Sequence, residues 1–344
     1  MGELKKECDK QGVTFATSSH RAEHFWFLNG GRTVGYDNEV LDEKYRDFYG
    51  PAHNIHKINN LHNLLKQEHG ITPTKEWLED WLVNSCELID KYHPETLFFD
   101  WWVMNYAFRP YMKKFLAYYY NRSVEWDKEV CVQYKSDAIM YNVGIFDRER
   151  GQLAATSPYI WQSETSTAYN SWSYCTTNKF KTAGKIAGTF VDVISKNGNF
   201  VLNLGPKADG TFCEEEMQIL EKLSDWTAKN KEAIWGTQPY KVFGEGKKHG
   251  NGSFNEKYNY SRKDYRFTYK TGSIYIFVLK PDRTTFKIKS LKYSGDMFAA
   301  DIKNVEILGY NQNLHYERNN KCLKIELDSP IETDMPLCFK VSID

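Results

Sequence analysis

Short apolar segments alternate with amphipathic segments along the first two thirds of the chain. Apolar runs with the length of buried strands lie at 13–19, 95–100, 129–134, 159–164 and 199–204. Apolar residues at helical spacing lie at 74–92, 109–120, 179–195 and 214–229. Buried strands that alternate with helices are typical of parallel β/α units.

The pattern changes after Pro239. Segments such as 273–279 and 321–327 alternate apolar and polar residues with a period of two, and Gly, Asn and Asp interrupt them. This pattern is typical of antiparallel strands that bury one face. We therefore predict a β/α domain over residues 1–238 and an antiparallel β-sandwich over residues 239–344, with the boundary near 238–245.

The number of predicted β/α units is small. We count about five before Asn203, whereas a closed eight-stranded barrel typically needs roughly 250 residues. The sequence is therefore compatible with an open sheet, or with a chain that begins partway through a barrel.

Composition narrows the classes of function. Lys+Arg and Asp+Glu are 45 each, so no overall basic charge favours nucleic acid as a partner. No apolar run is long enough to span a bilayer. The seven cysteines include no CxxC pair, which disfavours a structural zinc site. Aromatic residues make up 15% of the chain, and although most should be core, this content favours a protein that handles sugars.

The strongest candidate for chemistry is Asp100, which ends an apolar strand in the segment LFFDWW (97–102). An acid at a strand end, followed by Trp101 and Trp102, lies where β/α folds build their active sites. An aspartate is also a favoured helix N-cap, and a helix follows within several residues. The residue pattern alone leaves both interpretations open.

Three further segments carry ionisable groups after apolar runs. FDRERG (146–151) is interpreted as a charged loop and WQSETS (161–166) as another acidic strand end. SSHRAEH (18–24) follows the first strand, at the start of a polar loop that extends to about Asn60. It is interpreted as a polar ligand clamp, because His20 and His24 would suit a metal only on a helix.

Acids at the ends of different strands meet the requirement of two-carboxylate glycoside hydrolysis. One carboxylate attacks the anomeric carbon, and the other group protonates the departing oxygen and later deprotonates water. In retaining enzymes the two carboxyl groups stand about 5–5.5 Å apart.

Together these segments resemble the α-L-fucosidases of glycoside hydrolase family 29. The resemblance runs in order through nearly the whole chain and is strongest between residues 95 and 245. The segments that carry it are SSHRAEH (18–24), YGPA (49–52), PETLFFDWW (94–102), FDRERG (146–151), WQSETS (161–166) with SWSY (171–174), 191–210 and 229–246.

The resemblance implies a (β/α)8-like catalytic domain followed by a β-sandwich, and retaining cleavage of terminal α-L-fucose from fucosylated oligosaccharides or glycoconjugates. It implies no cofactor and no metal, and a secreted, periplasmic or lysosomal location. The sequence carries no signal of oligomeric state.

The resemblance also implies roles for single residues. Asp100 would be the nucleophile. Many members carry Glu directly after the Trp of the WQ strand, but this chain has Gln162 there, so Glu149 is the first candidate for the acid/base and Glu164 the second. The remaining residues would orient or enclose the sugar: His20, Glu23, His24, Trp101, Trp102, Arg148, Arg150 and Trp161.

Residues 1–15 do not match the opening segment of the family. We therefore expect the chain to lack about the first third of the catalytic barrel and part of its fucose pocket. The alternative hypotheses are a catalytically inactive, glycan-binding remnant of a fucosidase, and a glycosidase of another barrel family.

Overall fold

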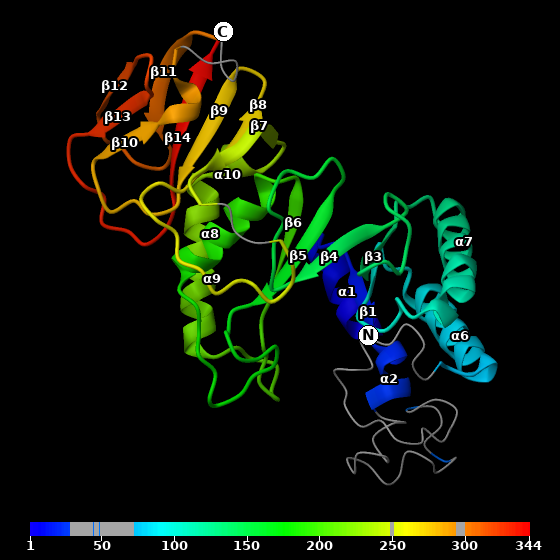
Figure 1. The fold of residues 1–344 in the computed structure, drawn as a ribbon. Helices are drawn as coiled ribbons and strands as arrows, with labels where there is room; N and C mark the ends of the chain where they lie inside the picture. The colour runs from blue at the N-terminus through cyan, green and yellow to red at the C-terminus, as the bar shows by residue number, and fades with distance from the viewer. Residues whose placement is uncertain (28–43, 45–47, 49–71, 248–250, 294–299) are drawn as a thin grey trace. The chain divides into compact units, whose positions relative to one another are not determined.

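The computed structural model describes residues 1–27, 44, 48, 72–247, 251–293 and 300–344 (Figure 1). The chain divides into two compact units, Met1–Asp147 and Arg148–Asp344. The YGPA motif (49–52) lies outside the described residues. The division into domains near residue 238 stays a prediction.

The first unit is a parallel sheet with helices. Its strands pair in the order β1-β2-β3-β4, which is also their order along the chain. The strands are β1 (Ala16–Ser19), β2 (Thr96–Phe99), β3 (Cys131–Lys135) and β4 (Ile145–Glu149), which crosses into the second unit. The helices are α1 (Gly2–Gln11), α2 (Arg21–Phe27), α6 (Lys75–Tyr92), η2 (Tyr106–Phe108) and α7 (Arg109–Glu125).

Aromatic side chains of the helices form the core of this unit. Helix α6 begins at its N-cap Thr74, whose side chain accepts a hydrogen bond from the Trp77 backbone N–H. Fully buried Trp81 of the same helix packs edge-on against Phe108, with ring centroids 5.1 Å apart, and against Phe99 of β2 at 5.3 Å. These contacts fix α6 against β2, the strand that directly precedes Asp100.

The second unit contains two more parallel strands. Strand β5 (Trp161–Ser166) pairs with β6 (Gly198–Asn203), and Trp161 lies opposite Gly198. A Cβ atom at Gly198 would come within 2.7 Å of the Trp161 ring, so only glycine fits there. The helices of this part are α8 (Ala183–Ile194), α9 (Glu214–Lys229) and α10 (Lys231–Ile234).

The rest of the second unit is built from two antiparallel sheets, which enclose an apolar core (Figure 1). The five-stranded sheet has the order β11-β14-β9-β8-β7, and the three-stranded sheet has the order β10-β13-β12. The elements are β7 (Gln238–Glu245), β8 (Tyr265–Lys270), β9 (Ser273–Val278), β10 (Thr285–Ile288), η3 (Lys289–Leu291), β11 (Ile302–Ile307), β12 (Leu314–Arg318), β13 (Leu323–Leu327) and β14 (Leu337–Ile343).

A buried charge cluster joins α8 to β8. Asp192 of α8 accepts hydrogen bonds from Lys196 at 2.6 Å and from Arg266 of β8 at 2.5 Å. All three side chains are essentially inaccessible to solvent. Burial raises the pKa of Asp192, but the two cations outweigh burial and hold that pKa below its usual value.

Most of the predicted elements are confirmed, and two predictions are wrong. FDRERG (146–151) was interpreted as a loop, but residues 145–149 form strand β4, so the described residues contain six parallel strands rather than about five. The predicted polar loop after the first strand contains helix α2. None of the described helices could cross a membrane.

We predict that Asp192→Asn lowers the free energy of unfolding by about 3–5 kcal/mol near neutral pH, because it leaves two buried cations without a counter-charge. The deficit should shrink as the pH falls below about 4, since a carboxyl with a lowered folded-state pKa loses its contribution as it is protonated. Urea unfolding of both proteins at several pH values measures this. Asp209→Asn, at an exposed aspartate, is the control, and an equal effect in both variants would contradict the prediction.

Candidate active site

The register of the sheet brings three strand ends of the first unit together. Ser19, Phe99 and Tyr134 lie opposite one another in β1, β2 and β3. His20 directly follows β1, Asp100 directly follows β2, and Lys135 is the last residue of β3. Because these strands are parallel, all three side chains belong to the same edge of the sheet, where β/α folds place their sites.

Asp100 is the centre of this group. Its Oδ2 lies 3.3 Å from His20 Nδ1, and its Oδ1 lies 3.8 Å from Lys135 Nζ. His20 Nδ1 is also 3.3 Å from Glu23 Oε1 in the first turn of α2. Among the described residues, buried Asp100 Oδ1 has no hydrogen-bond partner. His20 thus engages one carboxylate oxygen, and the charge of Lys135 lies near the other.

The electrostatics favour an ionised Asp100. Burial raises the pKa of this carboxyl, but the hydrogen bond with His20 and the charge of Lys135 outweigh burial and lower the pKa. The same hydrogen bond with Asp100, helped by Glu23, raises the pKa of His20 to about 10. Burial and the charge of Asp100 raise the pKa of Glu23. The arrangement stabilises an imidazolium beside a carboxylate.

Lys135 and Asp147 complete the site, and the sequence analysis missed both. Lys135 Nζ lies 2.6 Å from Asp147 Oδ2, and both side chains are almost fully buried. The Lys135 ammonium also lies 5.5 Å from the ring centroid of Trp101. The sequence features that could have indicated them are a lysine at the end of an apolar strand, for Lys135, and an aspartate directly after a phenylalanine, for Asp147.

Three side chains of this group could be considered for a metal. His20, Glu23 and Asp100 offer ligand atoms within 4.8 Å of one another. A metal requires a neutral imidazole, whereas the pKa of His20 is raised to about 10 by its hydrogen bond with Asp100. A metal ion at this trio would therefore have to displace the proton of His20.

The other predicted residues of the first unit lie close to Asp100 in the chain or on α2. His24 Nδ1 is 2.9 Å from the Phe48 carbonyl oxygen, and burial lowers the pKa of His24. Trp101 is partly exposed and Trp102 is buried. Trp102 has φ 78°, a left-handed conformation that is costly for a bulky residue and that concentrates at functional sites. Their roles as sugar-contacting residues stay predictions.

Glu149 and Glu164 belong to the second unit, and their backbones are fixed. The Glu149 carbonyl, at the end of β4, accepts a hydrogen bond from Phe254 N–H at 2.9 Å, and the Glu164 carbonyl of β5 accepts one from Arg150 N–H at 2.8 Å. The Glu149 side chain is buried, and that of Glu164 is half-buried. The two acids therefore lie on neighbouring, well-supported segments.

The Arg150 side chain makes several contacts within the second unit, and its predicted role in binding the sugar stays a prediction. Its Nη1 donates to Glu256 Oε1 at 3.0 Å, and its Nη2 donates to Ser166 Oγ at 2.8 Å. Its guanidinium also lies over the Trp172 ring, 4.3 Å from the centroid. Lys181 Nζ lies 2.9 Å from the same Glu256 oxygen. These contacts connect the end of β4 to the segment that follows β5.

Trp161 and Gln162 open strand β5 and are both buried. The Trp161 indole N–H donates to the Lys196 carbonyl at 3.0 Å, and its ring packs against Gly198. This placement gives Trp161 contacts typical of a core residue, and its predicted place in a sugar pocket stays a prediction. Arg148 lies half-buried in β4 between Asp147 and Glu149.

Comparisons with known proteins agree on one family. The family model described as alpha-L-fucosidase matches residues 1–232. The alpha-L-fucosidase of Branchiostoma floridae is 24% identical over 248 residues, which are 66% of this chain and 54% of that protein. The tissue alpha-L-fucosidase of Rattus norvegicus is 25% identical over 204 residues, 57% of this chain and 44% of that protein. The chain thus spans about half the length of these relatives.

A solved structure has the same fold. The Thermotoga maritima alpha-fucosidase in complex with fucose superposes with a TM-score of 0.67 at 22% identity, covering 99% of this chain and 67% of that one. With the parallel strands and the two antiparallel sheets, this similarity confirms the predicted fold class, part of a (β/α)8-like barrel followed by a β-sandwich.

We predict that His20→Ala raises the pKa of Asp100, because the variant removes the largest interaction that opposes burial. Carbon-13 NMR titration of labelled aspartate carboxyl groups measures this pKa directly. In the unchanged protein the imidazole of His20 should remain protonated at pH 8. His315→Ala, at an exposed histidine of β12, is the control. An Asp100 titration that is the same in both variants would show that His20 does not stabilise the carboxylate.

Proposed function

Because the chain belongs to the α-L-fucosidase family, we propose that it hydrolyses terminal α-L-fucose from fucosylated oligosaccharides or glycoconjugates. The observation that carries this proposal is Asp100, a strand-end carboxylate with one oxygen bound by His20 and the other lacking a hydrogen-bond partner among the described residues. The Thermotoga maritima protein of the same fold holds fucose.

We further propose a double displacement with retention of configuration. An Asp100 oxygen attacks the anomeric carbon of fucose, and the bond from that carbon to the glycosidic oxygen breaks. A carboxylic acid gives its proton to the departing oxygen. The resulting carboxylate then takes a proton from water, whose oxygen displaces Asp100 and regenerates the enzyme.

His20 and Lys135 would support the first step. A nucleophilic carboxylate must be ionised at the working pH, and the imidazolium and the ammonium both favour the ionised form. His20 Nδ1 lies 3.3 Å from Oδ2 and Lys135 Nζ lies 3.8 Å from Oδ1, so the two cations also orient the carboxylate. Glu23, His24 and Trp101 lie on or near this group and are the proposed contacts for the sugar hydroxyls and the ring face.

Glu149 is the proposed acid/base. It ends β4, directly after Asp147 and Arg148, and its carbonyl is held by Phe254. Its side chain is buried. The guanidinium of the neighbouring Arg150 is directed to Glu256. Glu164 is the second candidate.

A glycan-binding protein without activity is the alternative. Gln162 stands where many members of the family carry glutamate, and an amide cannot transfer a proton as a carboxylic acid does. Hydrolysis of an aryl α-L-fucoside by the unchanged protein distinguishes the two, because binding alone releases no aryl alcohol.

We predict that Asp100→Gly lowers kcat/KM for an aryl α-L-fucoside by roughly a thousandfold or more. Azide should restore part of the activity, because it fits the space of the lost carboxylate and attacks the same carbon. The product should be the β-fucosyl azide, inverted relative to the substrate, which proton NMR identifies. Asp127→Gly is the control, since φ 51° at that residue suits glycine. Undiminished activity in Asp100→Gly would remove the aspartate from the mechanism.

We predict that Glu149→Gly slows hydrolysis of a substrate with a poor leaving group by about 10²–10⁴-fold. A dinitrophenyl fucoside should be affected less, because its leaving group departs without a proton. Azide should accelerate the variant and give the α-fucosyl azide by attack on the covalent intermediate. Glu164→Gly is the matched variant. Azide rescue of Glu164→Gly but not of Glu149→Gly would reverse the assignment.

A further inference from the structure

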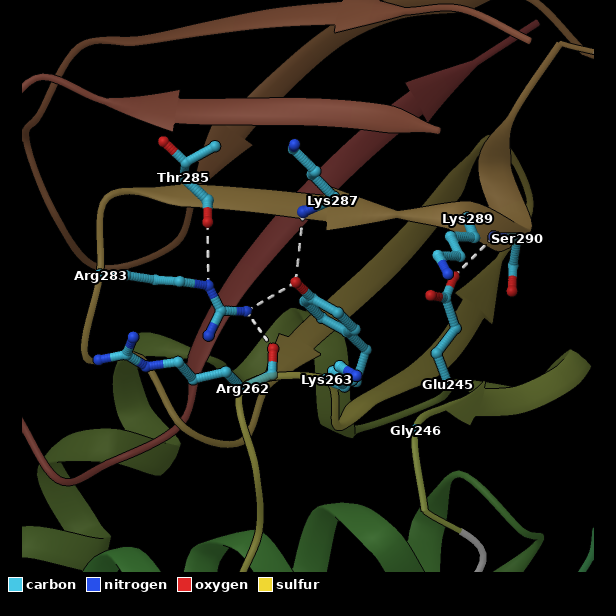
Figure 2. Close-up of a pocket in the computed structure, with 10 residues that line it drawn as sticks. Glu245, Gly246, Arg262, Lys263, Arg283, Thr285, Lys287, Lys289 and Ser290 are labelled. Atoms are coloured by element: carbon cyan, nitrogen blue, oxygen red, sulfur yellow. Dashed lines mark hydrogen bonds between the residues drawn. The ribbon is translucent and has the colours of Figure 1, made fainter. Parts of the chain in front are cut away.

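A cleft of about 790 Å³ lies in the β-sandwich, far along the chain from every residue of the proposed mechanism. It lies between the start of β8, the end of β7, and β10 with η3 (Figure 2). Strands β7 and β10 are edge strands of the two different sheets. We call this cleft the basic cleft, and its charged lining residues are Glu245, Arg262, Lys263, Arg283, Lys287 and Lys289.

The charges in the basic cleft are unbalanced. Five cationic side chains face one carboxylate, so the lining carries four net positive charges. The chain as a whole has 45 basic and 45 acidic residues, so this excess is local. Within the described part of the chain, no carboxylate forms an ion pair with Lys263, Lys287 or Lys289.

The single carboxylate is already engaged. Glu245 Oε1 accepts a hydrogen bond from the Ser290 backbone N–H at 2.6 Å, at the beginning of η3. Of the two arginines, Arg262 is exposed and forms an ion pair with Asp282 at 2.9 Å. The three lysines therefore present their ammonium groups to solvent within a concave surface.

The floor of the cleft is rigid. Arg283 is mostly buried and donates from Nε to the Thr285 carbonyl at 2.9 Å and from Nη2 to the Tyr265 hydroxyl at 2.8 Å (Figure 2). The same arginine donates to the Arg262 carbonyl. The Tyr265 hydroxyl also accepts from the Lys287 backbone N–H at 3.3 Å. These bonds connect β8 to β10 and fix the backbone that carries the lysines.

Edge strands often carry lysine for another reason, since a charged edge resists pairing with a second chain. That role requires neither a concave surface nor a buried arginine network beneath it. A cleft of this volume is within the range of small-ligand sites, about 300–1,000 Å³. A binding site is favoured by the combination of a concave surface, a fixed backbone and three lysines without an ion pair among the described residues.

We propose that the basic cleft binds an acidic glycan, a short sugar chain that carries sulfate or carboxylate groups. The choice of a glycan rests on the proposed function, since an enzyme that trims fucose would meet such chains next to its substrate. A nucleic acid fits less well, because single strands need stacked aromatic faces, and among the described residues Tyr265 is the one aromatic side chain that lines the cleft.

The test uses the full chain and a heparin-derived tetrasaccharide as the sulfated probe, with binding measured by calorimetry. The variant Lys263→Ala/Lys287→Ala removes two cations from the cleft. The control Lys241→Ala/Lys321→Ala removes two exposed lysines of the sandwich that do not line it. We expect the cleft variant to bind at least tenfold more weakly than the unchanged protein, and the control to bind within twofold of it. Binding should also weaken as salt is added.

Hydrolysis of an aryl α-L-fucoside should be the same in all three proteins, because the substrate is neutral and small. If the unchanged protein binds the tetrasaccharide but does not hydrolyse the fucoside, the proposed function is rejected and the proposed binding site is retained. Equal affinity of the two double variants would overturn the site. Equal binding of a neutral tetrasaccharide, which carries neither sulfate nor carboxylate groups, would overturn its anionic specificity. If inorganic sulfate or single-stranded DNA binds as tightly as the tetrasaccharide, the cleft is not specific for a glycan and the proposal is overturned.

Discussion

The carboxyl group proposed as the nucleophile is buried, yet it must be ionised to attack, and burial opposes ionisation. Burial raises the pKa of Asp100, so the site depends on the cations that reverse that effect. His20 supplies a hydrogen bond, and Lys135 supplies charge at 3.8 Å. Lys135 is itself almost fully buried and is held by Asp147 at 2.6 Å. The alternation of base and acid across the four neighbouring strands β1 to β4 thus keeps each charge compensated.

The second unit contains another buried carboxyl group, that of Glu256, whose pKa is lowered by its partners. Burial raises the pKa of this carboxyl, but hydrogen bonds from Thr165, Lys181 and Arg150 outweigh burial and lower it. Glu256 lies in the segment between β7 and β8, and the neighbouring Phe254 holds the carbonyl of Glu149. A Cβ atom at Gly151 would lie 2.0 Å from the Gly252 carbonyl oxygen, so the two backbones are in direct contact there. A loop of the β-sandwich therefore supports the strand that carries the proposed acid/base.

Much of the fold could be predicted from the sequence, because its strands and helices are locally consistent. The helix at 74–92 has a capping threonine, tryptophans at helical spacing and an apolar strand directly after it, and each of these features favours the observed α6. The site was predictable only in part. Asp100 was accessible to reasoning because an acid directly after an apolar strand is conspicuous. Its partner Lys135 could not be predicted, because a lysine that ends a strand usually lies in solvent. Only the strand register shows that Lys135 lies beside Asp100.

Strand β4 was misread for a related reason. Three of its five residues are Asp147, Arg148 and Glu149, and a pattern method assigns such a segment to a solvated loop. Yet Asp147 and Glu149 are buried. A charged group can be buried without a large cost only where an opposite charge and hydrogen-bond partners are present. Asp147 meets that condition through Lys135, which lies one strand away at the matching register position. Local hydrophobicity cannot report a partner twelve residues distant in the chain. A segment that breaks the hydrophobic pattern and is nevertheless buried therefore indicates charge pairs formed between distant parts of the chain. Such pairs can stabilise the fold, as around Asp192, or lie beside the candidate site, as Asp147 and Lys135 do.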